Sequence, residues 1–213
     1  MNQERAKKIA KLLLKIKAVT LNVEKPYRYT SGILSPIYCD NRLIMSYPEK
    51  RKEVVQAFLD MIKEENLEFD VVAGVATAGI THAAFIAEKL DLPMAYIRSS
   101  KKEHGKENKI EGKIDDDQKA LIVEDLVSTG GSSVDAATAV KKVTDCIAVF
   151  TYEMEKAKQK FADANINLYT LSNFSTLMEV AVEENYITNE QKNIALEWNN
   201  DPQGWGKKMG FEN

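Results

Sequence analysis

The stretch Ala120–Ser133 holds the residue types of this chain that are best suited to binding a sugar phosphate. It reads ALIVEDLVSTGGSS, so that an apolar run meets two adjacent acids, Glu124 and Asp125, before small and hydroxylated residues begin. Carboxylates accept hydrogen bonds from ribose hydroxyls, whereas backbone N–H groups and hydroxyls at a helix start bind phosphate. The pattern therefore predicts a strand at 120–123, a ligand-binding loop after it, and a helix at 131–142.

An ordinary capped turn between a strand and a helix is the alternative for this stretch. Gly130 and Gly131 let a backbone approach an anion closely, and Ser132 and Ser133 have side chains that can cap a helix. Two acids directly after a Leu-Ile-Val run, followed by Ser-Thr-Gly-Gly-Ser, form a more specific string than a capped turn needs. We therefore favour the sugar-phosphate interpretation.

A second polar turn, Gly74–Thr81, follows another short apolar run. Its sequence GVATAGIT fits the G-x-x-x-x-G frame of a nucleoside triphosphate loop, but Ile80 occupies the place of the lysine that pairs with the β- and γ-phosphates. That mismatch excludes an ATPase loop, and the sequence contains no G-x-G-x-x-G string, which disfavours a nicotinamide-binding fold. Two interpretations remain, a backbone site for pyrophosphate and a close-packed turn between a strand and a helix.

The third polar segment, Arg98–Lys113, is a long charged stretch without an apolar period. It contains six lysine and arginine residues and three glutamates, so it is locally cationic in a chain whose net charge is -3. Long charged loops inside compact domains are often active-site lids, and Gly105 and Gly112 would let this one move. A polyanionic substrate would explain the charge, and a solvated surface loop is the alternative.

Short apolar runs alternate with amphipathic helical patterns along most of the chain, which predicts an α/β fold with a parallel sheet covered on both faces. Ligands bind beyond the carboxyl ends of such strands, so we expect the three polar segments at one edge of the sheet. Residues 20–47 are rich in Tyr, Pro, Ser and Thr and predict short strands and irregular structure that cap the main domain. The runs that predict strands are 71–75, 94–97, 120–123, 146–150 and 167–171, and the patterns that predict helices are 3–18, 48–65, 79–90, 131–142, 153–163, 174–184 and 188–198.

Length and composition restrict the class of protein. The 213 residues are 44% hydrophobic, which is enough for one full core, and the net charge of -3 argues against a basic nucleic-acid surface. No apolar run approaches the roughly 20 residues that cross a bilayer, and the N-terminus lacks a signal-peptide pattern. Cys39 and Cys146 have no metal or CxxC spacing, so we expect reduced core residues, and we expect His82 to be packed or solvent-exposed. These features predict a cytoplasmic globular protein with neither nucleic acid nor membrane as a partner.

The sequence VEDLVSTGGS at 123–132 resembles the phosphoribosyl pyrophosphate (PRPP) signature of the type I phosphoribosyltransferases. Within that family the chain is similar to the bacterial orotate phosphoribosyltransferases. The strings that carry this second resemblance are TSGILSPIYCDNR at 30–42, ATAGI at 76–80, KEHGK at 102–106 and IEG at 110–112. The signature points to the wider family, whereas the N-terminal Ser-Gly-x-x-Ser-Pro string and the Lys-x-His-Gly string point to orotate.

The resemblance implies a type I phosphoribosyltransferase fold in a single domain, 1–213, with a five-stranded parallel core at roughly 48–198 and a small hood at roughly 1–47. It implies transfer of ribose 5-phosphate from PRPP to N1 of orotate, which gives orotidine 5′-monophosphate and pyrophosphate in pyrimidine (UMP) biosynthesis. It also implies Mg²⁺ as a cofactor and a homodimer in which Arg98 reaches the neighbouring subunit's PRPP site.

The matching motifs imply roles for individual residues. Glu124 and Asp125 are expected to hold the ribose hydroxyls, and Lys102 and His104 to close on the pyrophosphate, so that these four form the implied catalytic set. PRPP itself would hold most of the Mg²⁺ coordination, with Asp125 as the candidate protein ligand. The residues implied for the 5′-phosphate are Leu126, Val127, Ser128, Thr129, Gly130, Gly131 and Ser132. Those implied for the pyrophosphate turn are Thr77, Ala78 and Gly79. Those implied for orotate are Ser128, Thr30, Ser31 and Gly32.

Four positions depart from the enterobacterial pattern of the family. Thr30, Ala78 and Ser99 stand where that pattern has lysine, and no arginine occurs between Phe150 and Glu155, where the pattern has one that contacts orotate. The surrounding strings are intact, which indicates a difference between subfamilies. The resemblance therefore leaves the residues that contact orotate open.

Two rival functions deserve a test. A purine phosphoribosyltransferase would share the PRPP signature, and pyrophosphate release with each base in turn separates it from an orotate enzyme. A regulator that senses PRPP without catalysis is the second rival. Such proteins usually add a basic DNA-binding domain, which residues 16–47 and the acidic net charge do not indicate, and the charged loop after Arg98 favours catalysis.

Lys102→Ala is predicted to lower turnover by orders of magnitude with the fold intact, because a loop lysine stabilises the negative charge that develops on the leaving pyrophosphate. A closing lid also excludes water, which would otherwise hydrolyse the cation-like sugar. Steady-state turnover, with circular dichroism as the control for folding, measures the effect. Near-normal turnover in the variant would refute the lid assignment.

Overall fold

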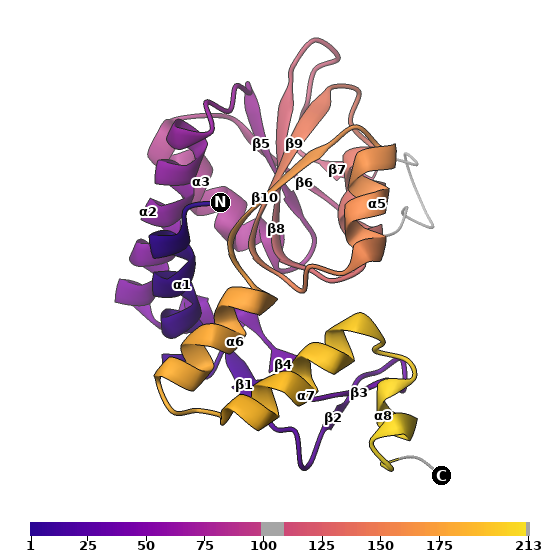
Figure 1. Ribbon diagram of the computed structural model, residues 1–213. Helices are drawn as coiled ribbons and strands as arrows, with labels where there is room; N and C mark the ends of the chain where they lie inside the picture. The colour runs from indigo at the N-terminus through magenta and orange to yellow at the C-terminus, as the bar shows by residue number, and fades with distance from the viewer. Residues whose placement is uncertain (99–108, 212–213) are drawn as a thin grey trace.

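The computed structural model describes residues 1–98 and 109–211, and within them the centre of the molecule is a six-stranded sheet (Figure 1). The strand order is β10-β9-β8-β5-β6-β7, in which five strands run parallel and β7 pairs antiparallel with β6 at one edge. This arrangement confirms the predicted α/β fold and adds one edge strand to the parallel core. The strands are β5 (Val71–Val75), β6 (Met94–Ile97), β7 (Ile110–Glu111), β8 (Ala120–Val127), β9 (Val143–Thr151) and β10 (Asn167–Asn173).

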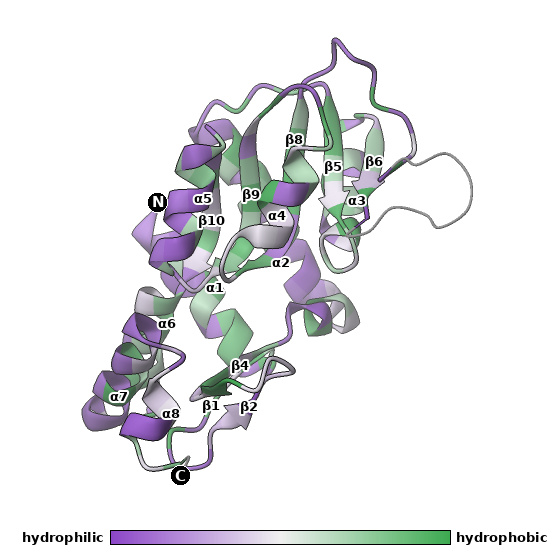
Figure 2. Cartoon of the chain, turned by 90° about the vertical axis from the view of Figure 1, so that its right-hand side faces the viewer, coloured by the Kyte–Doolittle hydropathy of each residue, from purple (hydrophilic) through white to green (hydrophobic). Residues whose placement is uncertain are grey.

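Helices cover both faces of this sheet, and the strands between them are apolar (Figures 1 and 2). On one face, buried side chains such as Leu13, Phe58 and Ile86 form one hydrophobic cluster, and on the other face Ala136 and Phe161 belong to a second. β5 is buried at every position, and because a strand buried on both faces reads as a continuous apolar run, it has the predicted bounds; β6 also has the predicted bounds. The first face carries α1 (Gln3–Lys15), α2 (Pro48–Glu64) and α3 (Gly79–Leu90), and the second carries α4 (Gly131–Ala137) and α5 (Glu155–Asp163).

The N-terminal strands lie together with the C-terminal helices at one end of the molecule (Figure 1). β1 pairs antiparallel with β4, and β2 with β3, which confirms short strands within residues 20–47. A short helix near the C-terminus, α8, was not predicted. The elements of this end are β1 (Val19–Leu21), β2 (Tyr27–Arg28), β3 (Leu34–Ser35), β4 (Ile37–Cys39), the 3-10 helix η1 (Asn41–Ser46), α6 (Phe174–Glu183), α7 (Asn189–Asn200) and α8 (Trp205–Lys208).

A cluster of aromatic rings joins this end to the sheet. Trp198 of α7 is fully buried and donates its indole N–H to the carbonyl oxygen of Leu34 at 2.9 Å. Its ring lies 5.6 Å from that of Tyr152, which follows β9, and 6.4 Å from that of Tyr29 in the N-terminal segment. The two tyrosine hydroxyls lie 3.1 Å apart, within hydrogen-bonding distance. Burial of large aromatic side chains dominates the energetics of such junctions, so Trp198 fixes α7 against both parts.

The strand that carries the acid pair is longer than predicted. We expected it to end at Val123, but β8 continues to Val127, because Leu126 pairs with Phe150 and Val127 with Thr151 of β9. Glu124 and Asp125 interrupt the apolar run without interrupting the backbone pairing, since β9 still offers hydrogen-bonding groups there. The prediction for the following helix is also wrong at its end, because α4 stops at Ala137.

Two further expectations concern cysteines and membranes. Both cysteines are free thiols, Cys146 buried and Cys39 partly buried, and burial raises the pKa of each. Among the helices of residues 1–98 and 109–211, none is long and apolar enough to cross a bilayer.

His82 illustrates how burial sets a charge state in this fold. Its side chain is buried in α3 beside Phe58 of α2, with the two ring centroids 5.9 Å apart, and its Nδ1 has no hydrogen-bond partner among the described residues. Burial lowers the pKa of His82 to about 4, so the folded protein keeps this imidazole neutral.

His82→Phe is predicted to weaken the pH dependence of the free energy of unfolding. His82 is protonated near pH 6.5 in the unfolded chain and only near pH 4 in the folded chain. The contribution of its neutral imidazole to the free energy of unfolding is therefore fully present above about pH 6.5 and is lost as the pH falls towards 4. Between pH 7 and pH 4.5 this group should account for roughly 2–3 kcal/mol. Urea titrations of both proteins at the two pH values measure it, and equal losses of stability in both would contradict the assignment.

Candidate active site

The carboxyl ends of β8, β5 and β6 lie side by side because these strands are neighbours in the sheet. Gly74 pairs with Val123 and Val75 pairs with Ile97, which places the turn after β5 between the acid pair on β8 and Arg98 after β6. The Ala76 N–H also donates to the Ile97 carbonyl oxygen at 2.8 Å. The structure thus brings two of the polar segments and the start of the third to one edge. Lys102 and His104 lie outside the described residues.

The turn after β5 is in direct contact with the strand of the acid pair through Gly79. A Cβ atom on Gly79 would lie 2.3 Å from the carbonyl oxygen of Val123 and 3.2 Å from the Cα atom of Glu124. No side chain fits in that space, so glycine is required for the turn to approach the strand. The backbone at Thr77 and Ala78, predicted to meet pyrophosphate, is thereby fixed beside the carboxylates, and the peptide bond between Ala76 and Thr77 is cis.

The acid pair lies at the centre of this edge. Glu124 is buried, and its two carboxylate oxygens accept hydrogen bonds from the Ser133 hydroxyl at 3.2 Å and from the Asp125 N–H at 3.1 Å. Burial, followed by the charge of Asp125, raises the pKa of Glu124 to about 8, and burial raises the pKa of Asp125. The Asp125 carbonyl oxygen accepts a hydrogen bond from Asn41 at 2.8 Å, which ties η1 to β8.

The loop after β8 opens α4 in a different way from the one predicted. Gly130 is the N-cap residue with a left-handed φ of 73°, and the predicted caps, Ser132 and Ser133, lie inside the helix without capping it. Ser133 instead donates to Glu124. The loop from Ser128 to Ser132 presents hydroxyls and N–H groups, and the Lys160 ammonium lies 3.1 Å from the position of a Cβ atom on Gly131. A cation that the sequence motifs did not indicate therefore lies beside the predicted phosphate loop.

Arg98 directly follows β6 at the same edge, and its side chain lies along β7. The Arg98 guanidinium is 3.4 Å from the Glu111 carboxylate. The backbone N–H of Arg98 donates to the Lys109 carbonyl oxygen at 2.9 Å. Lys109 in turn forms an ion pair with Asp135 of α4 at 2.6 Å. The cationic segment is thus anchored at both described ends near the phosphate loop.

A cavity of about 420 Å³, which we call the α5–α7 cavity, adjoins the phosphate loop. Ser31 and Ser128, both predicted for orotate, line it, whereas Thr30 and Gly32 lie on the same exposed turn but outside its lining. The start of α5 and the end of α7 supply part of the wall, so this cavity contains residues that no motif indicated. The remaining lining residues are Tyr29, Ile33, Thr129, Met154, Glu155, Lys156, Trp198, Asn199, Asn200, Pro202 and Gln203.

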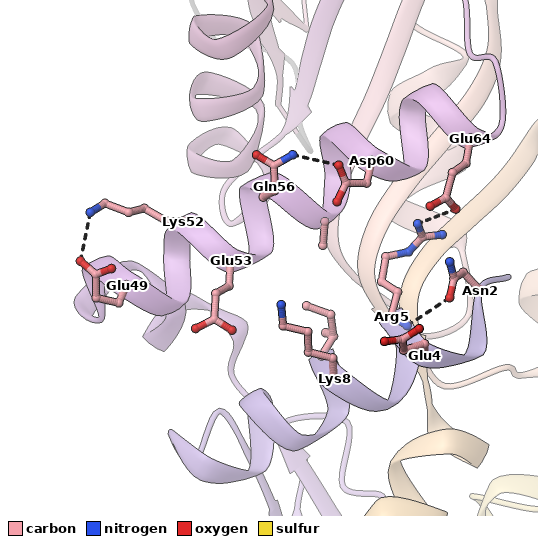
Figure 3. A pocket seen from close by; sticks show the side chains of 12 residues that line it. Asn2, Glu4, Arg5, Lys8, Glu49, Lys52, Glu53, Gln56, Asp60 and Glu64 are labelled. Carbon is pink, nitrogen blue, oxygen red and sulfur yellow. Dashed lines mark hydrogen bonds and ion pairs between the residues drawn. The ribbon is translucent and has the colours of Figure 1, made fainter.

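Another cavity, of about 500 Å³, lies between α1 and α2 (Figure 3). Five carboxylates and three cationic side chains line it, and Arg5 points to Glu64, with 2.8 Å between guanidinium and carboxylate. A net negative lining repels a polyanion, and none of these residues belongs to the three polar loops. This cavity is therefore not the site for a sugar phosphate.

Comparisons with known proteins agree with this geometry. A family model described as the phosphoribosyl transferase domain matches residues 48–170. The orotate phosphoribosyltransferase of Coxiella burnetii is 61% identical over 209 residues, covering 96% of this chain and 99% of that protein. The orotate phosphoribosyltransferase of Enterococcus faecalis is 52% identical over 206 residues, covering 95% of this chain and 98% of that protein.

Solved structures share the fold. The UMP synthase of Leishmania donovani superposes with a TM-score of 0.76 at 23% identity, covering 91% of this chain and 42% of that chain. The orotate phosphoribosyltransferase of Aeropyrum pernix superposes with a TM-score of 0.69 at 22% identity, covering 84% of this chain and 99% of that chain. The sheet with its helical layers is thus common to these proteins despite low identity.

Gly79→Ala is predicted to destabilise the protein by about 1–3 kcal/mol and to impair activity, because the added methyl group would meet rigid backbone of β8. Gly131→Ala is the matched control for stability. Its methyl group would meet only the flexible end of Lys160, so the free energy of unfolding should change by no more than about 0.5 kcal/mol. Denaturant unfolding measures both variants, and equal stabilities would contradict the close approach of Gly79 to β8.

Proposed function

The chain belongs to the orotate phosphoribosyltransferases of the phosphoribosyl transferase family. From this premise we propose which part of its site binds each part of the substrates. The reaction transfers ribose 5-phosphate from PRPP to N1 of orotate and releases pyrophosphate, a step of pyrimidine biosynthesis. The contact of Gly79 with β8 carries the proposal, because it sets a pyrophosphate turn beside the acid pair. PRPP carries its pyrophosphate on the carbon next to the ribose hydroxyls, which fits that spacing.

In this proposal Glu124 and Asp125 hold the ribose hydroxyls. Burial raises the pKa of each carboxyl, although the charge of Arg42 partly opposes the shift at Asp125, and hydroxyl donors from a sugar would supply hydrogen bonds to both. Ser133 and Asn41 keep the pair in place through its carboxylate and backbone. Residues 126–132 then receive the 5′-phosphate through backbone N–H groups and hydroxyls, with Lys160 adjacent.

The leaving pyrophosphate develops negative charge while the ribose ring becomes cation-like. The backbone at 77–79, Lys102, His104 and Arg98 are proposed to stabilise that charge, with Arg98 acting on the neighbouring site of a homodimer. Orotate has an acidic ring N–H and its own carboxylate, so N1 attack needs no strong base from the protein. We further propose that 1–213 is one domain, with the hood at roughly 1–47 and the core at roughly 48–198.

Mg²⁺ is the proposed cofactor, and the residues present fit a role as partial ligands. Among the described residues no group of three or more acid, histidine or cysteine side chains could enclose a metal ion. Mg²⁺ commonly binds through one or two carboxylates plus substrate phosphates and water, and the buried Glu124 and the partly buried Asp125 would offer such carboxylates at the ribose. When bound, the ion would neutralise charge on the pyrophosphate.

Glu124→Gln and Asp125→Asn are each predicted to lower kcat/KM by roughly 10- to 100-fold, since each loses a charge-assisted hydrogen bond to a ribose hydroxyl. Asp116→Asn is the matched control, because Asp116 is exposed and pairs only with surface Lys141 in the described structure. Orotate absorbance, followed with PRPP and Mg²⁺ present, measures the three variants beside the wild type. No orotate consumption by folded wild-type protein would overturn the function, and unaffected acid variants would overturn the ribose assignment.

A further inference from the structure

We propose that Lys160 of α5 binds the 5′-phosphate of PRPP and of the product nucleotide through its ammonium group, and thereby selects a phosphorylated sugar. The inference rests on the proposed function and deepens it, because it adds a side chain from another element to the phosphate loop, residues 126–132. None of the sequence motifs contains Lys160.

The helix that carries Lys160 packs directly on the phosphate loop at Gly130. A Cβ atom on Gly130 would lie 3.2 Å from the ring of Phe161 and 3.3 Å from the Cα atom of Ala157. Gly130 also has the left-handed φ of 73°, which a residue with a side chain rarely adopts. Ala157 and Phe161 are four residues apart and share one face of α5, and both are buried. The contact of this face with Gly130 fixes the distance between α5 and the loop.

Lys160 lies at the edge of that face, where its side chain reaches the next residue of the loop. Its ammonium nitrogen lies 3.1 Å from the position of a Cβ atom on Gly131. Lys160 is exposed, and no carboxylate pairs with it within residues 1–98 and 109–211. Lys158, two residues earlier and thus on nearly the opposite side of the helix, forms an ion pair with Glu155 at 3.2 Å. Lys160 therefore combines a free charge with a place beside the loop.

The phosphate loop itself contains no charged side chain. Its residues, LVSTGGS, can offer a phosphate only backbone N–H groups and hydroxyls, whereas a phosphate monoester carries close to two negative charges at neutral pH. The acids that precede the loop, Glu124 and Asp125, add negative charge on the β8 side. An ammonium group beside the loop offsets these charges, and its hydrogen bond to a phosphate oxygen is among the stronger polar contacts.

Lys160 would act on binding of the sugar phosphate and not on the bond-breaking step. The bond to pyrophosphate breaks at C1 of the ribose, whereas the 5′-phosphate is attached at the other end of the sugar. A loss of the ammonium group should therefore change KM values for substrates that carry the 5′-phosphate and leave kcat close to that of the wild type. An exposed lysine with no ligand is the alternative, and it predicts no change in either quantity.

Kinetics in both reaction directions test the assignment in the full-length protein. Lys160→Met is expected to raise the KM for PRPP roughly tenfold or more and to leave the KM for orotate unchanged. In the reverse reaction the KM for orotidine 5′-monophosphate should rise by a similar factor, whereas the KM for pyrophosphate, which has no 5′-phosphate, stays constant. Lys160→Arg keeps the charge and should restore most of the loss, and Lys158→Met is the matched control on the same helix, which should change none of the four KM values.

Calorimetric binding of ribose 5-phosphate tests the same contact without the base or pyrophosphate. Lys160→Met should bind it roughly tenfold more weakly than the wild type, and Lys158→Met should bind it as tightly as the wild type. An unchanged affinity for ribose 5-phosphate in Lys160→Met would overturn the assignment, as would an equal rise in the KM for pyrophosphate, because a general change of the electrostatic field would affect both anions. Wild-type protein that binds ribose 5-phosphate but does not consume orotate would instead overturn the proposed function.

Discussion

The close approach of Gly79 to the backbone of β8 is the contact on which the site depends. It leaves no space for a side chain between the turn after β5 and the residues Val123 and Glu124. The sheet order separately places β6, which Arg98 follows, on the other side of β5. The turn, the acid pair and Arg98 therefore share one edge, and a ligand with a pyrophosphate beside a diol matches their order.

A second constraint is mechanical. Trp198 and Tyr152 hold the C-terminal helices and the N-terminal hairpin against the end of β9, and Asn41 ties η1 to the carbonyl oxygen of Asp125. Segments from both ends of the chain thus pack together at the carboxyl end of β9. A change in the packing of α7 would alter the α5–α7 cavity as well as the fold, because the end of the same helix lines that cavity.

Charge is distributed according to the parts of the substrate. Glu124 is buried and Asp125 is partly buried, and burial raises the pKa of each carboxyl. Cations stand apart from this acid pair, with Lys160 at the phosphate loop, Lys156 in the α5–α7 cavity and Arg98 at the start of the cationic segment. This separation suits two substrates that together carry three anionic groups, the 5′-phosphate and pyrophosphate of PRPP and the carboxylate of orotate.

The sequence by itself determined the five parallel strands, their alternation with helices and the position of the polar segment after residue 123, because buried parallel strands read as apolar runs and the motif residues are adjacent in the chain. It did not determine where β8 ends, since backbone pairing with β9 continues past the polar pair. It also did not indicate that Asn41 bonds to the Asp125 carbonyl oxygen, that Ser133 bonds to Glu124 or that Lys160 lies beside Gly131. Only the packing of η1, α4 and α5 around β8 brings these side chains there, because tertiary contacts join segments that no local pattern connects.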